Sequence, residues 1–181
     1  MSDIERFHAI TGGPGSGKST LIEALGRCGY AHSIEAGRAI IRDQTAIDGP
    51  ALPSRDPLTF GELMLSWELH SHRLAHRQSG PVFFDRGVPD LVGYYRLLGR
   101  AVPSHVARAA ERFRYSRRVF LAPPWPKIFR QDAERKQTPE EAERTYEAMV
   151  AAYSSCGYAL VTLPLVSIDE RVRYMLENIE A

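Results

Sequence analysis

The chain has 181 residues, of which 44% are hydrophobic and 25% are charged, and its formal net charge is +1. These values are ordinary for a globular protein of one domain, and they exclude a disordered chain and a strongly charged binding protein. At this length we expect a single domain over 1–181. No apolar run approaches the roughly 20 residues of a membrane span, and the start of the chain lacks the layout of a signal peptide, so we expect no membrane partner. Cys28 and Cys156 stand far apart with no C-x-x-C spacing, which favours a reduced, cytoplasmic setting.

A glycine-rich loop follows the first expected strand, which covers 6–11. The loop reads Gly12-Gly13-Pro14-Gly15-Ser16-Gly17-Lys18-Ser19-Thr20, with the spacing G-x-x-x-x-G-K-[ST]. Glycines let successive backbone N–H groups converge on phosphate oxygens, and the helix expected next adds its N-terminal dipole. The spacing predicts an ATP site in which Lys18 binds the β- and γ-phosphates and the Ser19 hydroxyl binds Mg²⁺.

Helices and strands alternate along the rest of the chain, which predicts a parallel sheet covered on both faces. The long helix from Asp56-Pro57 carries Leu63, Trp67 and Leu74 at helical spacing, and we expect these residues on its buried face. The further expected elements are, in chain order, helix 19–28, strand 30–34, helix 39–44, helix 57–77, strand 81–85, helix 91–98, helix 103–114, strand 118–122, helix 139–156, strand 158–163 and helix 168–179.

Two carboxylates follow expected strands and therefore fall at the edge of the sheet that holds the phosphate loop. Asp85 closes an apolar strand, and we expect it to bind Mg²⁺ through water, the alternatives being an ion pair with Arg86 or a helix cap. Glu35 follows the second strand, and we expect it to orient or deprotonate an acceptor hydroxyl. The alternative for Glu35 is an exposed helix-start residue paired with Arg38.

A polar, basic segment precedes the strongest helix start of the chain, Thr138-Pro139-Glu140-Glu141. We expect residues 125–138 to form a lid, from which Arg130 and Arg135 neutralise charge that develops on the γ-phosphoryl group. The alternative is a solvated basic loop. Trp125 lies in the same segment, where stacking on a base and simple packing are both open.

Several classes of phosphate-loop protein are disfavoured by what the sequence lacks. The single asparagine, Asn178, excludes the Asn-Lys-x-Asp element that reads guanine, and no Leu-Ser-Gly-Gly-Gln sequence is present. Asp85 is followed by Arg86, whereas water-activating hydrolases usually place Glu there. An arginine cluster over 108–118 lacks interleaved aromatic residues, so we expect no nucleic-acid surface. A small phosphotransferase remains favoured.

The ordered set of these motifs resembles a family of small P-loop proteins known as predicted ATPases or AAA-domain proteins. That family is related to the ribosylnicotinamide-kinase domain of NadR and, more distantly, to nucleoside and nucleotide kinases. The resemblance implies a nucleotide-kinase-like fold with a lid, Glu35 and Asp85 near the acceptor, and adenine held by the loop after the last strand. The segments that carry it are 12–19, 35–38, 84–90, 131–135 and 157–171.

We therefore expect a three-layer α/β P-loop fold, with a central parallel sheet of about five strands and helices on both faces. The predicted function is Mg²⁺-dependent transfer of the ATP γ-phosphoryl group to a small nucleoside- or nucleotide-like acceptor, whose phosphate Arg38 and Arg86 could meet. The alternative is a slow ATPase that acts as a nucleotide-dependent switch or binding module. The identity of the acceptor, the choice of ATP over GTP and the oligomeric state stay open at this point.

Overall fold

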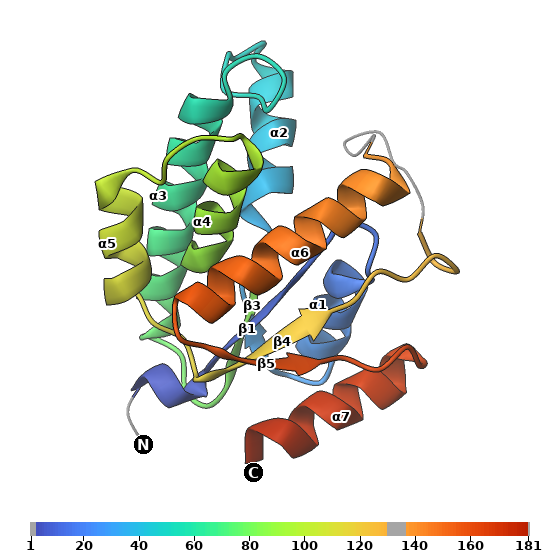
Figure 1. Ribbon diagram of the computed structural model, residues 1–181. Coiled ribbons are helices and arrows are strands. Elements are labelled where there is room, and N and C mark those ends of the chain that lie inside the picture. The colour runs from blue at the N-terminus through green and yellow to red at the C-terminus, as the bar shows by residue number, and fades with distance from the viewer. Residues whose placement is uncertain (1–2, 130–136, 181) are drawn as a thin grey trace.

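The computed structural model describes residues 3–129 and 137–180, which form one parallel sheet between two layers of helices (Figure 1). The strands lie in the order β2-β3-β1-β4-β5, and every neighbouring pair is parallel. The predicted α/β fold with a five-stranded parallel sheet is confirmed. The strands are β1 (Phe7–Gly12), β2 (Ala31–His32), β3 (Val82–Asp85), β4 (Arg118–Ala122) and β5 (Ala159–Thr162).

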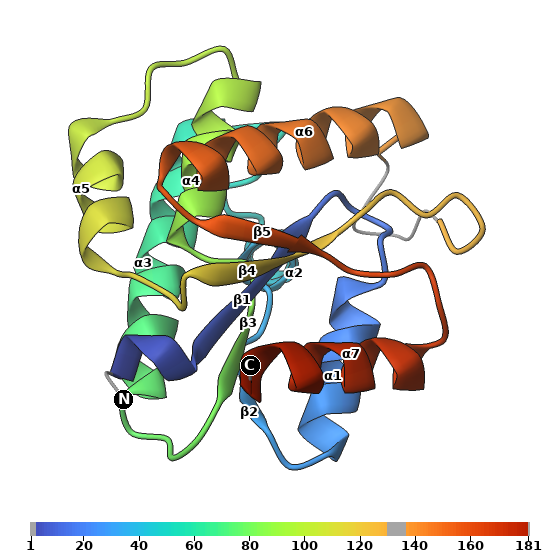
Figure 2. The ribbon, with the colours of Figure 1, turned by 60° about the horizontal axis from the view of Figure 1, so that its bottom comes forward.

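Within residues 3–129 and 137–180, seven α-helices and one short 3₁₀ helix surround this sheet. Two of the helices, α1 and α7, lie together on one face, while α3, α4 and α6 lie on the other (Figure 2). The helices are η1 (Asp3–Arg6), α1 (Lys18–Arg27), α2 (Ala36–Ala46), α3 (Pro57–Ala75), α4 (Val88–Leu97), α5 (Ser104–Arg112), α6 (Pro139–Ser155) and α7 (Ile168–Glu180).

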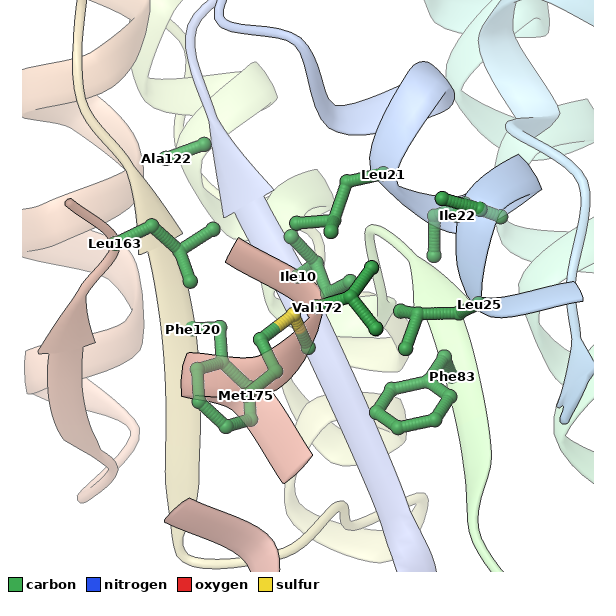
Figure 3. Packing of buried hydrophobic residues seen from close by; sticks show 11 residues of the cluster. Ile10, Leu21, Ile22, Leu25, Phe83, Phe120, Ala122, Leu163, Val172 and Met175 are labelled. Carbon is green, nitrogen blue, oxygen red and sulfur yellow. The ribbon is translucent and has the colours of Figure 1, made fainter. Parts of the chain in front are cut away.

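The core between the sheet and the pair α1 and α7 is built from strand residues that alternate toward this face. Ile10, Phe83 and Phe120 point from three neighbouring strands toward Leu21 of α1 and Met175 of α7 (Figure 3). Each of these five side chains is fully buried. Burial of each stabilises the fold by about 1.5–3 kcal/mol, which anchors both ends of the chain to the central strand.

The register of β1 determines where the functional segments meet. Ile10 of β1 lies opposite Asp85 of β3 on one side and Phe120 of β4 on the other, and Gly12 lies opposite Ala122. Because all the strands are parallel, the segments that leave their carboxyl ends emerge at one edge of the sheet. The phosphate loop and the residues after β3 are therefore neighbours.

The two strongest predicted helix starts are confirmed by their capping geometry. The Asp56 carboxylate accepts a hydrogen bond from the Thr59 N–H at 3.0 Å at the start of α3. At the start of α6 the Thr138 hydroxyl accepts from the Glu141 N–H at 3.2 Å, while the Glu141 carboxylate accepts from the Thr138 N–H at 2.8 Å. These side chains satisfy N–H groups that the first helical turn leaves without a partner.

Helices α2 and α4 begin earlier than predicted, and in α4 the cause is visible. Asp90 is the third residue of α4, and its carboxylate accepts from the Gly87 N–H at 3.0 Å, which caps the first turn. The sequence prediction started the helix after Asp90. In α2 the helix begins at Ala36 and contains Gly37, a residue with poor helix propensity.

The buried face of α3 differs from the predicted one. Leu74 is 40% exposed and Trp67 is half-buried, whereas Glu68 and His72 are 4% and 5% exposed. The His72 ring is held by a hydrogen bond between its Nε2 and the Arg114 carbonyl at 2.8 Å. The apolar spacing predicted the wrong face because α3 buries two polar side chains. His72 is buried with a hydrogen-bond partner, and Glu68 is buried in the wall of a cavity. No helix of the described residues is long and apolar enough to cross a membrane.

Candidate functional site

The loop between β1 and α1 has a backbone that requires glycine. Gly15 and Gly17 have φ angles of 73° and 81°, in the left-handed region that glycine tolerates best. A Cβ atom on Gly12 would lie 2.2 Å from the Ala122 carbonyl oxygen, so β4 leaves no room for a side chain there. Gly17 is also the N-cap of α1, so no side chain of the cap residue occupies the first N–H groups of the helix.

The Lys18 ammonium group lies inside the loop rather than in solvent. Lys18 is 3% exposed, and its Nζ donates to the Gly13 carbonyl at 2.6 Å and to the Ser16 hydroxyl at 3.2 Å. The loop thus combines a tightly turned glycine-rich backbone, a helix N-terminus and a buried cation, and these three features together favour a bound anion. These features fit the triphosphate that the spacing predicts.

The two predicted magnesium residues meet at the sheet edge. The Ser19 hydroxyl donates to the Asp85 carboxylate at 3.3 Å, although 66 residues separate them in the sequence. Asp85 is 2% exposed, and its backbone N–H donates to the Ser33 hydroxyl at 3.1 Å. The described residues hold no group of three or more His, Cys, Asp or Glu that could bind a metal ion. The pair of oxygen groups on Ser19 and Asp85 fits Mg²⁺, which is usually held by one or two protein oxygens, phosphates and water.

Glu35 is the N-cap residue of α2 and lies buried against Arg86. Its Oε1 accepts from the Arg86 Nε at 3.3 Å, and the Arg38 Nε lies 3.9 Å from Oε2. The side chain of Glu35 is 8% exposed, so it is not the exposed helix-start residue of the alternative reading. Its carboxylate faces the same region as the phosphate loop, because Arg86 also donates to the Gly12 carbonyl at 3.1 Å.

Asp90 organises this region, and sequence reasoning gave it no role. Its carboxylate accepts from the Thr11 hydroxyl at 2.7 Å, the Arg86 Nη1 at 2.9 Å and the Tyr153 hydroxyl at 2.6 Å, besides the N–H of Gly87. It therefore ties α4 to β1 and α6. The only signal in the sequence is that Asp90 follows Gly87 by three residues at the start of a helix. This spacing predicts the helix cap but not the bonds to Thr11, Arg86 and Tyr153.

Arg86 is held as a permanent cation in a left-handed backbone conformation. Its φ angle is 75°, which is unusual for a residue other than glycine and typical of constrained sites. Burial disfavours the charged guanidinium, but the carboxylates of Asp90, Glu35 and Asp85 outweigh it and raise the pKa of Arg86 above its usual value. One partly buried arginine thus fixes the orientation of two carboxylates beside the phosphate loop.

A cavity of about 490 Å³ extends from the phosphate loop toward the segment after β5. Residues Val166, Ser167 and Ile168 line it, where the resemblance places adenine. On the same side the Arg171 guanidinium lies 4.5 Å from the centre of the Trp125 ring. Arg171 is 1% exposed and donates to the Ser16 carbonyl at 2.9 Å and the Pro164 carbonyl at 2.8 Å.

A second cavity of about 440 Å³ adjoins the first, and Pro14, Arg38 and Gln137 line both. Charged side chains occupy one part of its wall, with Glu35 and Arg86 among them. The remaining wall is largely apolar and includes Phe60, Met64, Leu91 and Tyr94. A cavity of this size and mixed lining is suited to a small molecule with a flat apolar part.

Part of the expected lid lines the first cavity. Trp125, Ile128 and Phe129 contribute to its wall, and the Phe129 ring packs over Gly15 of the phosphate loop. Arg130 and Arg135, to which the sequence assigns charge neutralisation, lie outside the described residues. Their roles stay predictions.

Two members of the arginine cluster brace the fold. Arg114 donates to the Cys156 carbonyl at 2.9 Å and lies over the Tyr158 ring, with its guanidinium carbon 4.1 Å from the ring centre. Arg118 donates to the Asn178 carbonyl at 2.8 Å. These contacts join separate segments of the chain, so the two arginines stabilise the fold.

Comparison with known proteins points to one family and one fold. The model of the family described as AAA domain matches residues 7–171. A search of curated proteins finds no match.

Among solved structures, a NadR protein in complex with NR has a TM-score of 0.69 and 15% identity; the match covers 98% of this chain and 50% of the NadR chain. A second NadR structure, with NAD and AMP-PNP, has a TM-score of 0.65, 16% identity and the same coverage. The chain thus spans about half the length of NadR.

A deoxyadenosine kinase from M. mycoides, with the products dCMP and dCDP, has a TM-score of 0.59 and 15% identity. Here the match covers 96% of this chain and 98% of the kinase. At these identities the likenesses establish the fold.

Proposed function

Because the chain belongs to the AAA domain family over residues 7–171, we propose that it is a Mg²⁺-dependent kinase that transfers the γ-phosphoryl group of ATP to the hydroxyl group of a nucleoside-like small molecule. The observation that carries the proposal is the pair of adjoining cavities. One contains the phosphate loop, the other contains Glu35 and Arg86, and they share Pro14, Arg38 and Gln137. A phosphotransferase needs a donor site and an acceptor site that meet in this way.

The donor half of the proposed reaction uses the residues of the loop. Lys18 and the loop N–H groups would bind the β- and γ-phosphates, and Ser19 and Asp85 would hold Mg²⁺ and its water. The metal ion supplies positive charge that offsets the charge of the transferring group. Because Lys18 is buried beside the loop carbonyls, its cation faces the phosphates in surroundings that weaken its interactions less than bulk water does.

The acceptor half uses Glu35. The ion pair with Arg86 orients the Glu35 carboxylate. This carboxylate would accept the proton of the acceptor hydroxyl while the oxygen of that hydroxyl forms a bond to the γ-phosphorus. The bond from that phosphorus to the β–γ bridging oxygen breaks, and ADP leaves. Holding both substrates in place supplies most of the acceleration that such a site needs.

The relatives support a nucleoside-like acceptor. The NadR structures contain NR, and NAD with AMP-PNP, and the deoxyadenosine kinase contains dCMP and dCDP. Proteins of this fold therefore accommodate nucleosides, nucleotides and an ATP analogue. The apolar wall around Phe60 and Tyr94 fits the ring of such an acceptor.

The test is the rate of ADP release from Mg·ATP with and without a panel of nucleosides, nucleoside monophosphates and nicotinamide riboside. We expect one acceptor class to raise the rate about a hundredfold, which corresponds to about 2.7 kcal/mol of barrier, and Lys18→Ala to abolish the effect. Glu35→Gln should lower kcat by about 100-fold or more without changing the KM for ATP. Glu111→Gln, at an exposed position of α5, is the matched control.

A rate that is flat across the panel, yet lost in Lys18→Ala, would contradict the kinase and favour the nucleotide-dependent switch. Full activity in Glu35→Gln would remove Glu35 from the mechanism while leaving the kinase in place. The two results are independent, because the first concerns the acceptor and the second concerns one side chain.

A further inference from the structure

One oxygen of a buried carboxyl group that lines the second cavity has no hydrogen-bond partner among the residues that the structure describes. Glu68 lies on α3, is 4% exposed, and contributes to the cavity wall. Its Oε2 is shielded from solvent and forms no hydrogen bond within the described ranges. Most buried polar side chains are paired, so a group left like this in a cavity points to a partner that the fold itself does not provide.

Other charged groups face Glu68 from the elements around it. They are Asp85 at the end of β3, Arg86 after it, Asp90 on α4 and Glu35 at the start of α2. Three of these four are carboxylates, and the single guanidinium is already bound to two of them. A further negative charge is therefore unfavourable at this position.

The surroundings of Glu68 therefore favour its neutral carboxylic acid form over the carboxylate. Burial raises the pKa of Glu68 well above its usual range, and the Asp90 and Asp85 carboxylates raise it further. Burial also raises the pKa of the Tyr115 hydroxyl, which faces Glu68, above its usual range. A neutral carboxyl group offers an O–H donor and a C=O acceptor side by side, whereas a carboxylate can only accept.

The rest of the wall restricts what can reach this group. Phe60 and Met64 precede Glu68 by two turns and one turn of α3, so all three residues line one face of the helix. Tyr94 of α4 packs edge to face against Phe60, with ring centres 5.9 Å apart, so the two rings form one apolar part of the wall. Apolar walls of this kind favour a flat ring whose polar edge is directed at the carboxyl group.

We propose that Glu68 selects the acceptor, its carboxylic acid pairing with a heterocyclic ring that carries a hydrogen-bond donor and an acceptor on neighbouring atoms. Rings of this class have an amino group next to a ring nitrogen, as in cytosine and adenine. The inference rests on the proposed function, because it takes the second cavity to be the acceptor site. Glu68 is in this view a binding residue that sets specificity, while Glu35 acts on the reacting hydroxyl.

The test compares two substitutions of Glu68. Glu68→Gln keeps a donor and an acceptor and should retain most of the affinity for the acceptor. Glu68→Met has similar length but forms no such pair, and should raise the acceptor KM about 30-fold with the KM for ATP unchanged. The melting temperature of Glu68→Met should stay the same or rise, because the substitution removes a buried carboxyl oxygen that has no partner among the described residues. Glu62→Met, at a half-exposed position of the same helix, is the matched control and should leave both KM values unchanged.

Matched ligands sharpen the result. Adenosine and purine riboside differ only in the amino group beside the ring nitrogen, as do cytidine and its analogue without the amino group. Binding is measured by thermal shift without ATP, so that it does not depend on turnover. Wild-type protein should prefer the amino compound of at least one pair by about tenfold or more, and Glu68→Met should lose this preference.

The outcomes separate this inference from the proposed function. Selective binding without phosphoryl transfer would contradict the kinase and leave the role of Glu68 intact. Phosphoryl transfer with an acceptor KM that changes less than about threefold in Glu68→Met would overturn the role of Glu68 and leave the kinase. Wild-type protein that binds no compound of either pair, or both members of each equally, would also overturn the inference.

Discussion

The carboxylate of Asp90 receives four hydrogen bonds from three parts of the chain. Its donors are the hydroxyls of Thr11 and Tyr153, the guanidinium of Arg86 and the N–H of Gly87. An amide in its place would turn an NH₂ group toward some of these donors and would leave Arg86 with less compensating charge. Removing one partner of a buried ion pair is far costlier than removing an exposed one.

We therefore expect Asp90→Asn to lower the free energy of unfolding by about 3–5 kcal/mol, measured by urea denaturation. Tyr153→Phe removes a single hydrogen bond to the same carboxylate and should cost about 0.5–1.5 kcal/mol. A loss below about 1 kcal/mol in Asp90→Asn would show that Asp90 does not organise the site as the contacts suggest.

How much of the site could be predicted depends on whether a residue acts through its place in the sequence or through distant contacts. Lys18 and Ser19 belong to a local motif, and Asp85 ends a strand, so the sequence was enough to single them out. Asp90 and Glu68 owe their importance to neighbours far along the chain, and Glu68 has the spacing of an ordinary polar helix residue. No local pattern distinguishes a carboxyl group that faces a cavity from one that faces water.

Among the elements, α6 depends visibly on its first turn. Thr138 and Glu141 satisfy each other's backbone N–H groups at the start of this helix. The helix then carries Met149 and Tyr153 into the core. The start of α6 therefore affects both the packing of the sheet and the bond from Tyr153 to Asp90.

Thr138→Ala should lower the free energy of unfolding by about 1 kcal/mol, because the cap hydroxyl is lost. Thr145→Ala makes the same change within α6, where alanine has the better helix propensity, and should leave stability unchanged or slightly higher. Thermal or urea unfolding of both variants checks this. Equal destabilisation by the two substitutions would mean that the cap contributes nothing of its own.

Elements with strong local signals were the easiest to predict. Strand β4 and the starts of α3 and α6 agree with the sequence because they rest on apolar runs, Asp-Pro and a capping box. Strand β2 is only two residues long, and its position depends on pairing with β3, which no local pattern encodes. The buried face of α3 was misjudged for a related reason, since its burial is set by what the rest of the fold places against it.

At the scale of the whole molecule, stability should respond to acid through His8. This residue of β1 is 4% exposed beside Phe83, and burial, with a smaller contribution from Arg118, lowers its pKa to about 4. Unfolded chains bind a proton at this histidine below about pH 6.5, whereas the folded protein does so only near pH 4. Stability is therefore complete above pH 6.5 and falls as the pH drops from 6.5 to 4.

The expected loss from His8 is about 3 kcal/mol, measured by urea denaturation at a series of pH values. His8→Leu should remove most of this slope, and His72, whose pKa burial also lowers, should account for part of what remains. His70→Gln, at an exposed position, should leave the slope as it is. An unchanged slope in His8→Leu would assign the acid sensitivity to other groups.

The contact between Arg171 and the Ser16 carbonyl has a consequence for protein synthesis. The two residues are 155 positions apart, so the ribosome makes the phosphate loop long before it makes the arginine that braces it. A nascent chain thus carries the full glycine-rich motif through most of translation without the support of α7. We expect nucleotide binding to arise only after that helix has left the ribosome and docked.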